Sequence, residues 1–181
     1  MSGVKILVVC HKNTALLKSK ILLPIQVGTA LGKEKLENML ADDTGENISE
    51  KNPMYCELTA QYWAWKNLEA DYYGFFHYRR YLNFSDRKYK EDRWGNVRED
   101  ALSEAMKKKY ALSDDKIETL VRDYDLIISE EKNVVSMPGK AANVYEQYKY
   151  GDSLHIEDLE CISAIVKEKY PDYAEDLDVY L

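Results

Sequence analysis

The residues best suited to chemistry in this chain form one short run, His77-Tyr78-Arg79-Arg80-Tyr81, directly after an apolar segment. An arginine presents a planar fork of N–H donors that matches phosphate oxygens, and it keeps its charge when partly desolvated. Two adjacent arginines framed by aromatic rings could therefore clamp a diphosphate. The alternative is that Arg79 and Arg80 form surface ion pairs with the many carboxylates of the chain, and the spacing leaves both open.

A second polar run predicts the start of a helix. Asn52 is a good N-cap and Pro53 suits the first helical position. Because a helix N-terminus attracts anionic groups, we expect Asn52 and Tyr55 to contact substrate. Glu57 could be the base that deprotonates an acceptor hydroxyl, or it could only complement the helix dipole.

The same helix carries two tryptophans that cannot face the same way. Leu58, Tyr62 and Trp65 recur at helical spacing and predict the buried stripe of the helix. Trp63 then points elsewhere. We expect it to line a cleft and contact substrate.

Polar residues also lie in two early loops. Asp42 and Asp43 are an adjacent acidic pair that could hold Mg²⁺ or Mn²⁺ bridging a diphosphate, and either carboxylate could serve as the base. The alternative is an acidic turn that binds no ligand, so the sequence alone does not establish a cofactor. His11 follows the first apolar run. It could contact a nucleotide, or its ring nitrogens could find their hydrogen-bond partners within the protein.

Apolar runs and helical patterns alternate along the chain, which predicts a single α/β domain over residues 1–181 with a largely parallel sheet flanked by helices. Such sheets bind ligands at the carboxyl ends of their strands. The predicted strands are Val4 to Cys10, Tyr72 to His77 and Asp125 to Ser129, with Leu22 to Leu31 either a loop or a short strand. Helices are predicted for Lys33 to Leu40, from Asn52, from Ser113 to about Arg122, for Val144 to Tyr150 and from about Leu154 to Tyr170, and a long surface loop for Ser85 to Asp100.

Composition narrows the classes of function. The net charge of −7 argues against a general nucleic-acid or anionic-membrane binder. The three cysteines are widely spaced, which suggests neither a zinc site nor a disulfide framework and fits a reducing cytoplasm. No apolar run is long enough to predict a membrane span. Fifteen tyrosines against three phenylalanines suit either half-wet clefts where sugars stack or the rim of a core.

Several common catalytic motifs are missing from the sequence. It has no P-loop, no G-x-G-x-x-G, no G-x-S-x-G and no H-E-x-x-H pattern. Kinases, Rossmann dehydrogenases, serine hydrolases with that elbow and zincins are therefore disfavoured.

The runs of polar and aromatic residues described above, taken in their order along the chain, resemble the signature blocks of a bacterial glycosyltransferase family. This family acts in exopolysaccharide and capsule biosynthesis and is catalogued as domain of unknown function DUF4422. The similarity covers nearly the whole chain, and the His77–Tyr81 run is its most specific block. The other blocks are Asp42 to Ser49, Asn52-Pro53 with Tyr55 to Ala60, Tyr62 to Asn67, and the stretch from Tyr148 to Tyr173 with His155, Asp158-Leu159 and Tyr170-Pro171.

This resemblance implies a GT-A-like fold, a nucleotide-diphosphate sugar donor, UDP-linked in some relatives, and a glycan or lipid-linked glycan acceptor. His77, Arg79 and Arg80 fall where many GT-A enzymes carry an acidic metal-binding motif, so an arginine clamp could replace the ion in neutralising the leaving diphosphate. Family members usually continue past the position of Leu181. We therefore expect the acceptor side of the domain to be truncated.

Two functions remain open on these grounds. The first is a glycosyltransferase of the cytoplasm, held at the inner face of the membrane by partners, whose donor site includes His11, Arg79 and Arg80. The second is a non-catalytic carbohydrate- or nucleotide-binding module of a larger polysaccharide-assembly protein. Hydrolysis of the donor by the isolated chain would distinguish them.

Overall fold

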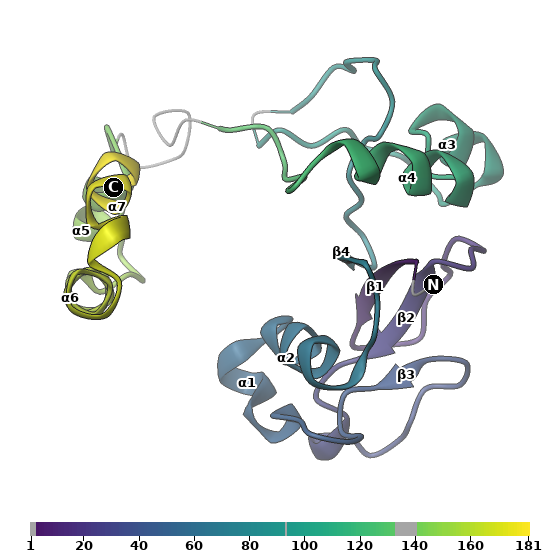
Figure 1. Cartoon of the computed structure of the whole chain (residues 1–181), viewed down its shortest axis with the longest axis horizontal. Helices are drawn as coiled ribbons and strands as arrows, with labels where there is room; N and C mark the ends of the chain where they lie inside the picture. Colours follow the sequence, from purple (N-terminus) through teal and green to yellow (C-terminus); the bar gives the residue numbers. More distant parts are fainter. Residues whose placement is uncertain (1–2, 93, 133–140) are drawn as a thin grey trace. The chain divides into compact units, whose positions relative to one another are not determined.

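The computed structural model describes residues 3–92, 94–132 and 141–181 of the chain (Figure 1). It divides into two compact units, the first made of residues 1–88 and 99–129 and the second of residues 89–98 and 130–181. The single domain over residues 1–181 stays a prediction.

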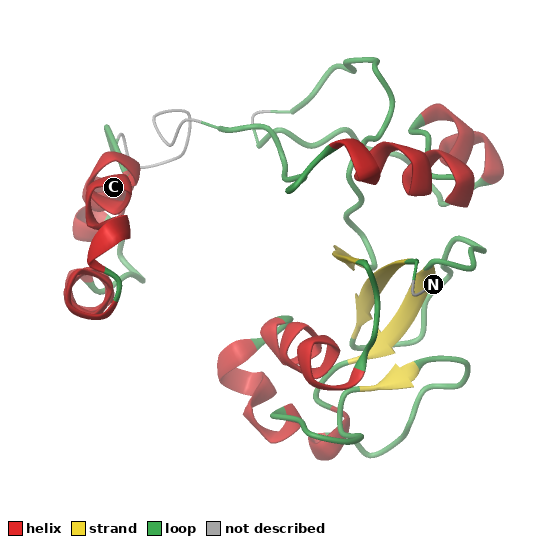
Figure 2. Cartoon of the chain, in the orientation of Figure 1, coloured by secondary structure: helices red, strands yellow, loops and turns green. Residues whose placement is uncertain are grey.

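The first unit contains a four-stranded sheet in the order β3-β2-β1-β4, drawn as yellow arrows in Figure 2. Its strands are β1 (Val4–Cys10), β2 (Leu22–Gln26), β3 (Leu40–Ala41) and β4 (Tyr72–His77). All three pairings are parallel, so the carboxyl ends of all four strands lie at the same edge. The predicted α/β class with a parallel sheet is confirmed.

The strand order reverses between β1 and β4, because β2 and β3 extend the sheet on one side of β1 and β4 lies on the other. In open α/β sheets the ligand-binding crevice lies at such a reversal, outside the carboxyl ends of the strands. The residues that follow Cys10 and His77 are therefore at the position where a site is expected.

Helix α2 (Leu58–Asn67) covers one face of the sheet. Leu7 and Val9 of β1 and Ile25 of β2 are buried against Trp63, and Ala60 and Ala64 complete this core. Burying a side chain of the size of leucine or isoleucine stabilises the fold by roughly 1.5–3 kcal/mol. The two alanines allow the helix backbone to lie close to the strands.

The single helix predicted from Asn52 is interrupted. Asn52 is the first residue of α1 (Asn52–Tyr55) rather than its N-cap, and a 3-10 turn, Ser49–Lys51, precedes it. Cys56 then has a φ of 46°, in the left-handed region, which ends α1 before α2 begins. The side-chain amide of Asn52 donates to the carbonyl oxygen of Cys56, which helps to fix this break.

The prediction for the two tryptophans was wrong. Trp63 is 7% exposed and lies in the core, whereas Trp65 is 69% exposed. The buried face of α2 is formed by Thr59, Ala60, Trp63 and Ala64, so Trp63 and small side chains, rather than Leu58 and Trp65, meet the sheet. The indole N–H of Trp63 donates to both the carbonyl and the hydroxyl oxygen of Thr44.

Two further predicted elements are absent. Residues 33–39 form turns instead of a helix, because the Gln26 side chain donates to the Glu34 carbonyl and accepts from the Leu36 N–H. Residues 125–129 form no strand; Leu126 and Ile128 are 74% and 72% exposed. A strand needs a partner, and among the described residues β4 pairs with β1 alone. The stretch from Leu22 to Leu31, for which the sequence predicted either a loop or a short strand, forms β2 and a 3-10 turn, Thr29–Leu31.

After β4, the first unit contains the helices α3 (Glu104–Lys109) and α4 (Asp114–Leu120). Ser113 is the N-cap of α4, as predicted, and a 3-10 turn, Val121–Asp123, extends it. The preceding helix, α3, was not predicted. The Asp114 carboxylate accepts from the Ser19 hydroxyl and the Lys20 N–H, which ties α4 to the loop before β2. The described residues of 85–100 form neither helix nor strand, in agreement with the predicted surface loop.

The helices of the second unit lie in its carboxyl-terminal part, residues 141–181. It contains α5 (Val144–Tyr150), α6 (Ile156–Lys169), a 3-10 turn (Pro171–Tyr173) and α7 (Ala174–Tyr180). The first two were predicted, and the end of α6 just before Pro171 follows from the missing N–H of proline. None of the helices in the described part of the chain is long and apolar enough to cross a bilayer.

Candidate functional site

At the reversal point of the sheet, side chains from two strand ends gather around the buried ring of Tyr78. The Tyr78 N–H donates to the Val9 carbonyl at 3.1 Å, so the chain that leaves β4 stays against the end of β1. The ring of His11, which follows β1, meets the Tyr78 ring edge-on at a centroid distance of 5.3 Å. Residues 67 positions apart in the sequence are thereby brought together.

The same ring also contacts three basic side chains. The centroid of the His77 ring lies 4.2 Å away, the guanidinium carbon of Arg79 5.0 Å and the Nζ of Lys12 5.6 Å. A cation over the face of an aromatic ring is attracted by the electrons of that ring. We call His11, Lys12, His77, Tyr78 and Arg79, with the neighbouring Arg80, the Tyr78 cluster. Lys12 was not among the predicted site residues, although its position directly after β1 was a signal for it.

A tight turn fixes the backbone of the two arginines of the Tyr78 cluster. The Arg80 N–H donates to the His77 carbonyl at 2.9 Å, and the Arg79 N–H donates to the His77 Nδ1 at 3.2 Å. Both arginines are exposed. Within the described ranges neither guanidinium lies within ion-pair distance of a carboxylate, so the structure does not show the surface ion pairs considered as the alternative.

Glu57 is placed beside this turn by the break between α1 and α2. Its Oε1 lies 4.0 Å from the Nε2 of His77, and its carboxylate is largely open to solvent. Burial lowers the pKa of His77 below its ordinary value, the nearby Arg79 and Arg80 charges lower it further, and Glu57 opposes them. The neutral imidazole is thus favoured in the fold.

Asp42 belongs to a different group of residues. It is 0% exposed, and its carboxylate oxygens accept from the N–H groups of Gly28 and Thr29 and from the hydroxyls of Ser49 and Thr59. We call these five residues the Asp42 cluster. A carboxylate with two donors on each oxygen has no free lone pair for an acceptor hydroxyl. We therefore assign Asp42 to the structure and no longer propose it as the base.

Three other predicted residues surround the Asp42 cluster or lie near it in sequence. The Asn52 amide donates to the Thr59 hydroxyl and so extends the cluster. Asp43 forms an ion pair with Lys35 at 2.9 Å. Tyr55 is exposed on α1.

The early acidic pair does not fit a cation site. The oxygens of Asp42 are engaged by four protein donors, and Asp43 is paired with Lys35. Within residues 3–92, 94–132 and 141–181, no group of three or more His, Cys, Asp or Glu side chains is placed to hold a metal ion.

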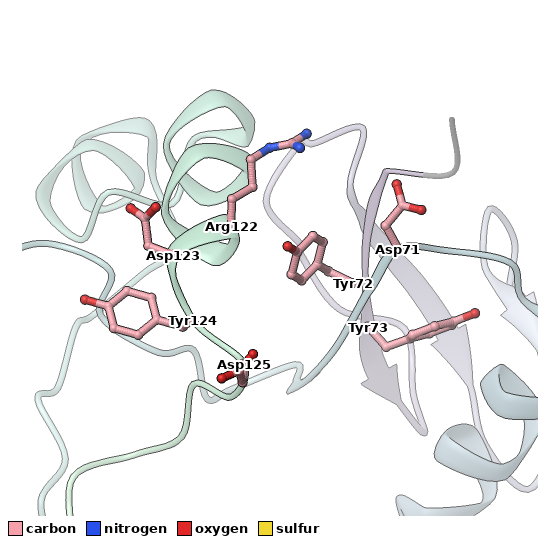
Figure 3. Close-up of a pocket in the computed structure, with 7 residues that line it drawn as sticks. All are labelled: Asp71, Tyr72, Tyr73, Arg122, Asp123, Tyr124 and Asp125. Carbon is pink, nitrogen blue, oxygen red and sulfur yellow. The ribbon is translucent and has the colours of Figure 1, made fainter.

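A surface hollow of about 480 Å³ lies at the other end of β4 (Figure 3). Residues 71–73 line one side and residues 122–125 the other. Asp71, Asp123 and Asp125 contribute three carboxylates against one guanidinium, that of Arg122. This lining does not suit a diphosphate. The amino end of β4 is therefore acidic, whereas its carboxyl end is basic.

The family model described as "Domain of unknown function (DUF4422)" matches residues 5–181 of this chain. The chain belongs to this family. The predicted family membership is therefore confirmed, and the match extends over both units of the DUF4422 chain. No curated protein matches it.

A solved structure described as the apo structure of the WbbM bifunctional glycosyltransferase is similar to this DUF4422 chain. The two are 41% identical with a TM-score of 0.91, and the match covers 98% of this chain and 31% of the other. The likeness to a glycosyltransferase fold that the sequence predicted is thus confirmed. The DUF4422 chain spans about a third of the length of the protein that it matches.

Proposed function

We propose that this chain binds the donor in a glycosyltransferase that moves a sugar from a nucleotide-diphosphate sugar, of the UDP type by family likeness, to a growing cell-surface polysaccharide. The observation that carries the proposal is the turn that presents Arg79 and Arg80 to solvent at the reversal point of the sheet. The similarity to WbbM, which is described as a bifunctional glycosyltransferase, supports it.

In this proposal the cations of the Tyr78 cluster act on the leaving group. Arg79 and Arg80 bind the diphosphate of the donor, and His11 and Lys12 lie on the β1 side of the same edge. Negative charge grows on the diphosphate as its bond to the sugar breaks, and fixed cations stabilise that charge more in the transition state than in the ground state.

Glu57 is proposed as the base. It takes the proton from the acceptor hydroxyl, the hydroxyl oxygen bonds to the anomeric carbon, and the bond from that carbon to the diphosphate breaks. Glu57 suits this role better than Asp42 because its carboxylate is open to solvent. Asp43 remains a second candidate, and the exposed Tyr55 is proposed to contact the acceptor sugar. We propose that the reaction takes place at the cytoplasmic face of the membrane, where partners hold the chain.

The test is a melting-temperature series with UDP and UDP-sugars, with and without Mn²⁺. A ligand that binds only the folded chain raises its melting temperature. Arg79→Ala and Arg80→Ala should each weaken UDP binding about 10–100-fold, since a hydrogen bond to a charged group contributes roughly 1.5–3 kcal/mol. Arg122→Ala is the matched control, because this arginine lies at the amino end of β4.

Two results would decide against the proposal. A chain whose melting temperature no nucleoside diphosphate raises does not bind a nucleotide donor. Loss of affinity in Arg122→Ala equal to that in Arg79→Ala would show that only overall charge matters. Nucleotide binding without donor hydrolysis would instead favour the binding module considered from the sequence.

A further inference from the structure

His77 lies between the arginine turn and Glu57. Its main-chain carbonyl accepts from the Arg80 N–H, and its Nδ1 accepts from the Arg79 N–H. Its other ring nitrogen, Nε2, faces the Glu57 carboxylate at 4.0 Å. The side chain is largely buried and packs against the Tyr78 ring. A single imidazole therefore joins two chain segments, the end of β4 and the junction of α1 and α2.

The bond to Nδ1 determines where the hydrogen of the neutral ring lies. A ring nitrogen that accepts an N–H carries no hydrogen itself, so neutral His77 has its hydrogen on Nε2. That hydrogen then faces the Glu57 carboxylate. With Nδ1 already occupied, His77 has no free lone pair to serve as a base.

We propose that neutral His77 is a positioning residue, which holds the Arg79-Arg80 turn through Nδ1 and orients Glu57 through the Nε2 hydrogen. This inference rests on the proposed function, since it gives the diphosphate-binding turn and the base a common support. His77 acts through its neighbours and does not itself touch the reacting atoms.

The groups around His77 make the neutral form the stable one. Glu57 faces it from the α1–α2 junction, Arg79 and Arg80 from the turn, and His11 from the end of β1. The three basic groups and burial together outweigh the one carboxylate in their effect on the pKa of His77. Protonation of Nδ1 would remove the acceptor of the Arg79 N–H, so the turn loses this hydrogen bond as the pH falls.

Two substitutions separate the two contacts. In His77→Asn the side-chain oxygen can take the place of Nδ1 as acceptor from an N–H two residues further on, as in an Asx turn, but it does not reach Glu57. In His77→Gln the amide nitrogen can take the place of Nε2, but the acceptor for the Arg79 N–H is lost. His77→Ala removes both contacts.

The first measurement is UDP affinity. His77→Asn should bind UDP within about threefold of the native chain, whereas His77→Gln and His77→Ala should bind about tenfold more weakly, the effect of one lost hydrogen bond. Native-like affinity in His77→Ala, or affinity in His77→Asn as weak as in His77→Gln, would overturn the proposal.

The second measurement needs no nucleotide and no variant at His77. Nitrogen-15 spectra of the native chain should show His77 with an unprotonated Nδ1 and a protonated Nε2 above its pKa, and that pKa should lie below 6.5. Glu57→Gln should leave the tautomer unchanged and lower the pKa of His77 further. The opposite tautomer overturns the inference, whatever the nucleotide result. Absence of UDP binding with the expected tautomer would instead reject the proposed function alone.

Discussion

The Tyr78 cluster and the Asp42 cluster follow strands of the same sheet at the same edge, yet they are built in opposite ways. Around Asp42, two N–H groups and two hydroxyls meet one buried carboxylate, and every oxygen lone pair is used inside the protein. Around Tyr78, the buried member is an aromatic ring, and the charged groups of Arg79 and Arg80 are exposed. Polar residues at this edge thus either hold loops together or remain available to a ligand. Burial and hydrogen-bond saturation distinguish the two.

The largest effect expected from this comparison is the loss of the Asp42 carboxylate. Asp42→Ala leaves the N–H groups of Gly28 and Thr29 and the Ser49 hydroxyl without this acceptor, while the Thr59 hydroxyl can turn to the Cys56 carbonyl. This loss should lower the free energy of unfolding by about 4 kcal/mol. Urea denaturation followed by tryptophan fluorescence, to which the buried Trp63 contributes, measures it. If the variant unfolds at the same urea concentration as the native chain, the Asp42 cluster does not stabilise the loops that it connects.

Asp43→Ala is the matched control at the next residue. Asp43 takes part in one ion pair at the surface, with Lys35. Such pairs contribute about 0–1 kcal/mol, so the same denaturation should give a decrease no larger than that. A decrease as large as that of Asp42→Ala would remove the distinction between the two aspartates.

The smallest effect on stability is expected at the Tyr78 cluster. The double variant Arg79→Ala, Arg80→Ala removes two exposed side chains, so its free energy of unfolding should stay within about 0.5 kcal/mol of the native value. The same protein should have lost UDP binding. Marked destabilisation would mean that the guanidinium groups support the fold, and the contrast with the Asp42 cluster would then fail.

Elements with a strong local signal were predictable from the sequence. The continuous apolar run of β1 and the aromatic run of β4 identified the two strands on either side of the reversal point, and a good N-cap or a proline marked α4 and the end of α6. The basic side of the candidate site followed from the same logic, because His11 and Arg79 come within two residues of the ends of these strands.

What depends on packing could not be predicted in this way. Helical spacing selected Trp65 for the core, but the sheet accepts the face with Ala60 and Ala64, which carries Trp63 instead. The apolar run from Leu126 has the composition of a strand, yet composition does not supply a partner. In the same way, Asp42 and Asp43 look alike in sequence, and only the donors from Gly28, Ser49 and their neighbours make one of them structural.

The outer edge of β4 has a consequence for handling the protein in solution. Among the residues that the structure describes, this strand ends the sheet, and its Tyr73 and Phe75 are exposed. Edges of this kind can template strand addition between molecules, and mutual repulsion at a net charge of −7 opposes it. Acidification toward the isoelectric point near 5.1 removes that repulsion, so colloidal stability is expected to be lost at mildly acidic pH.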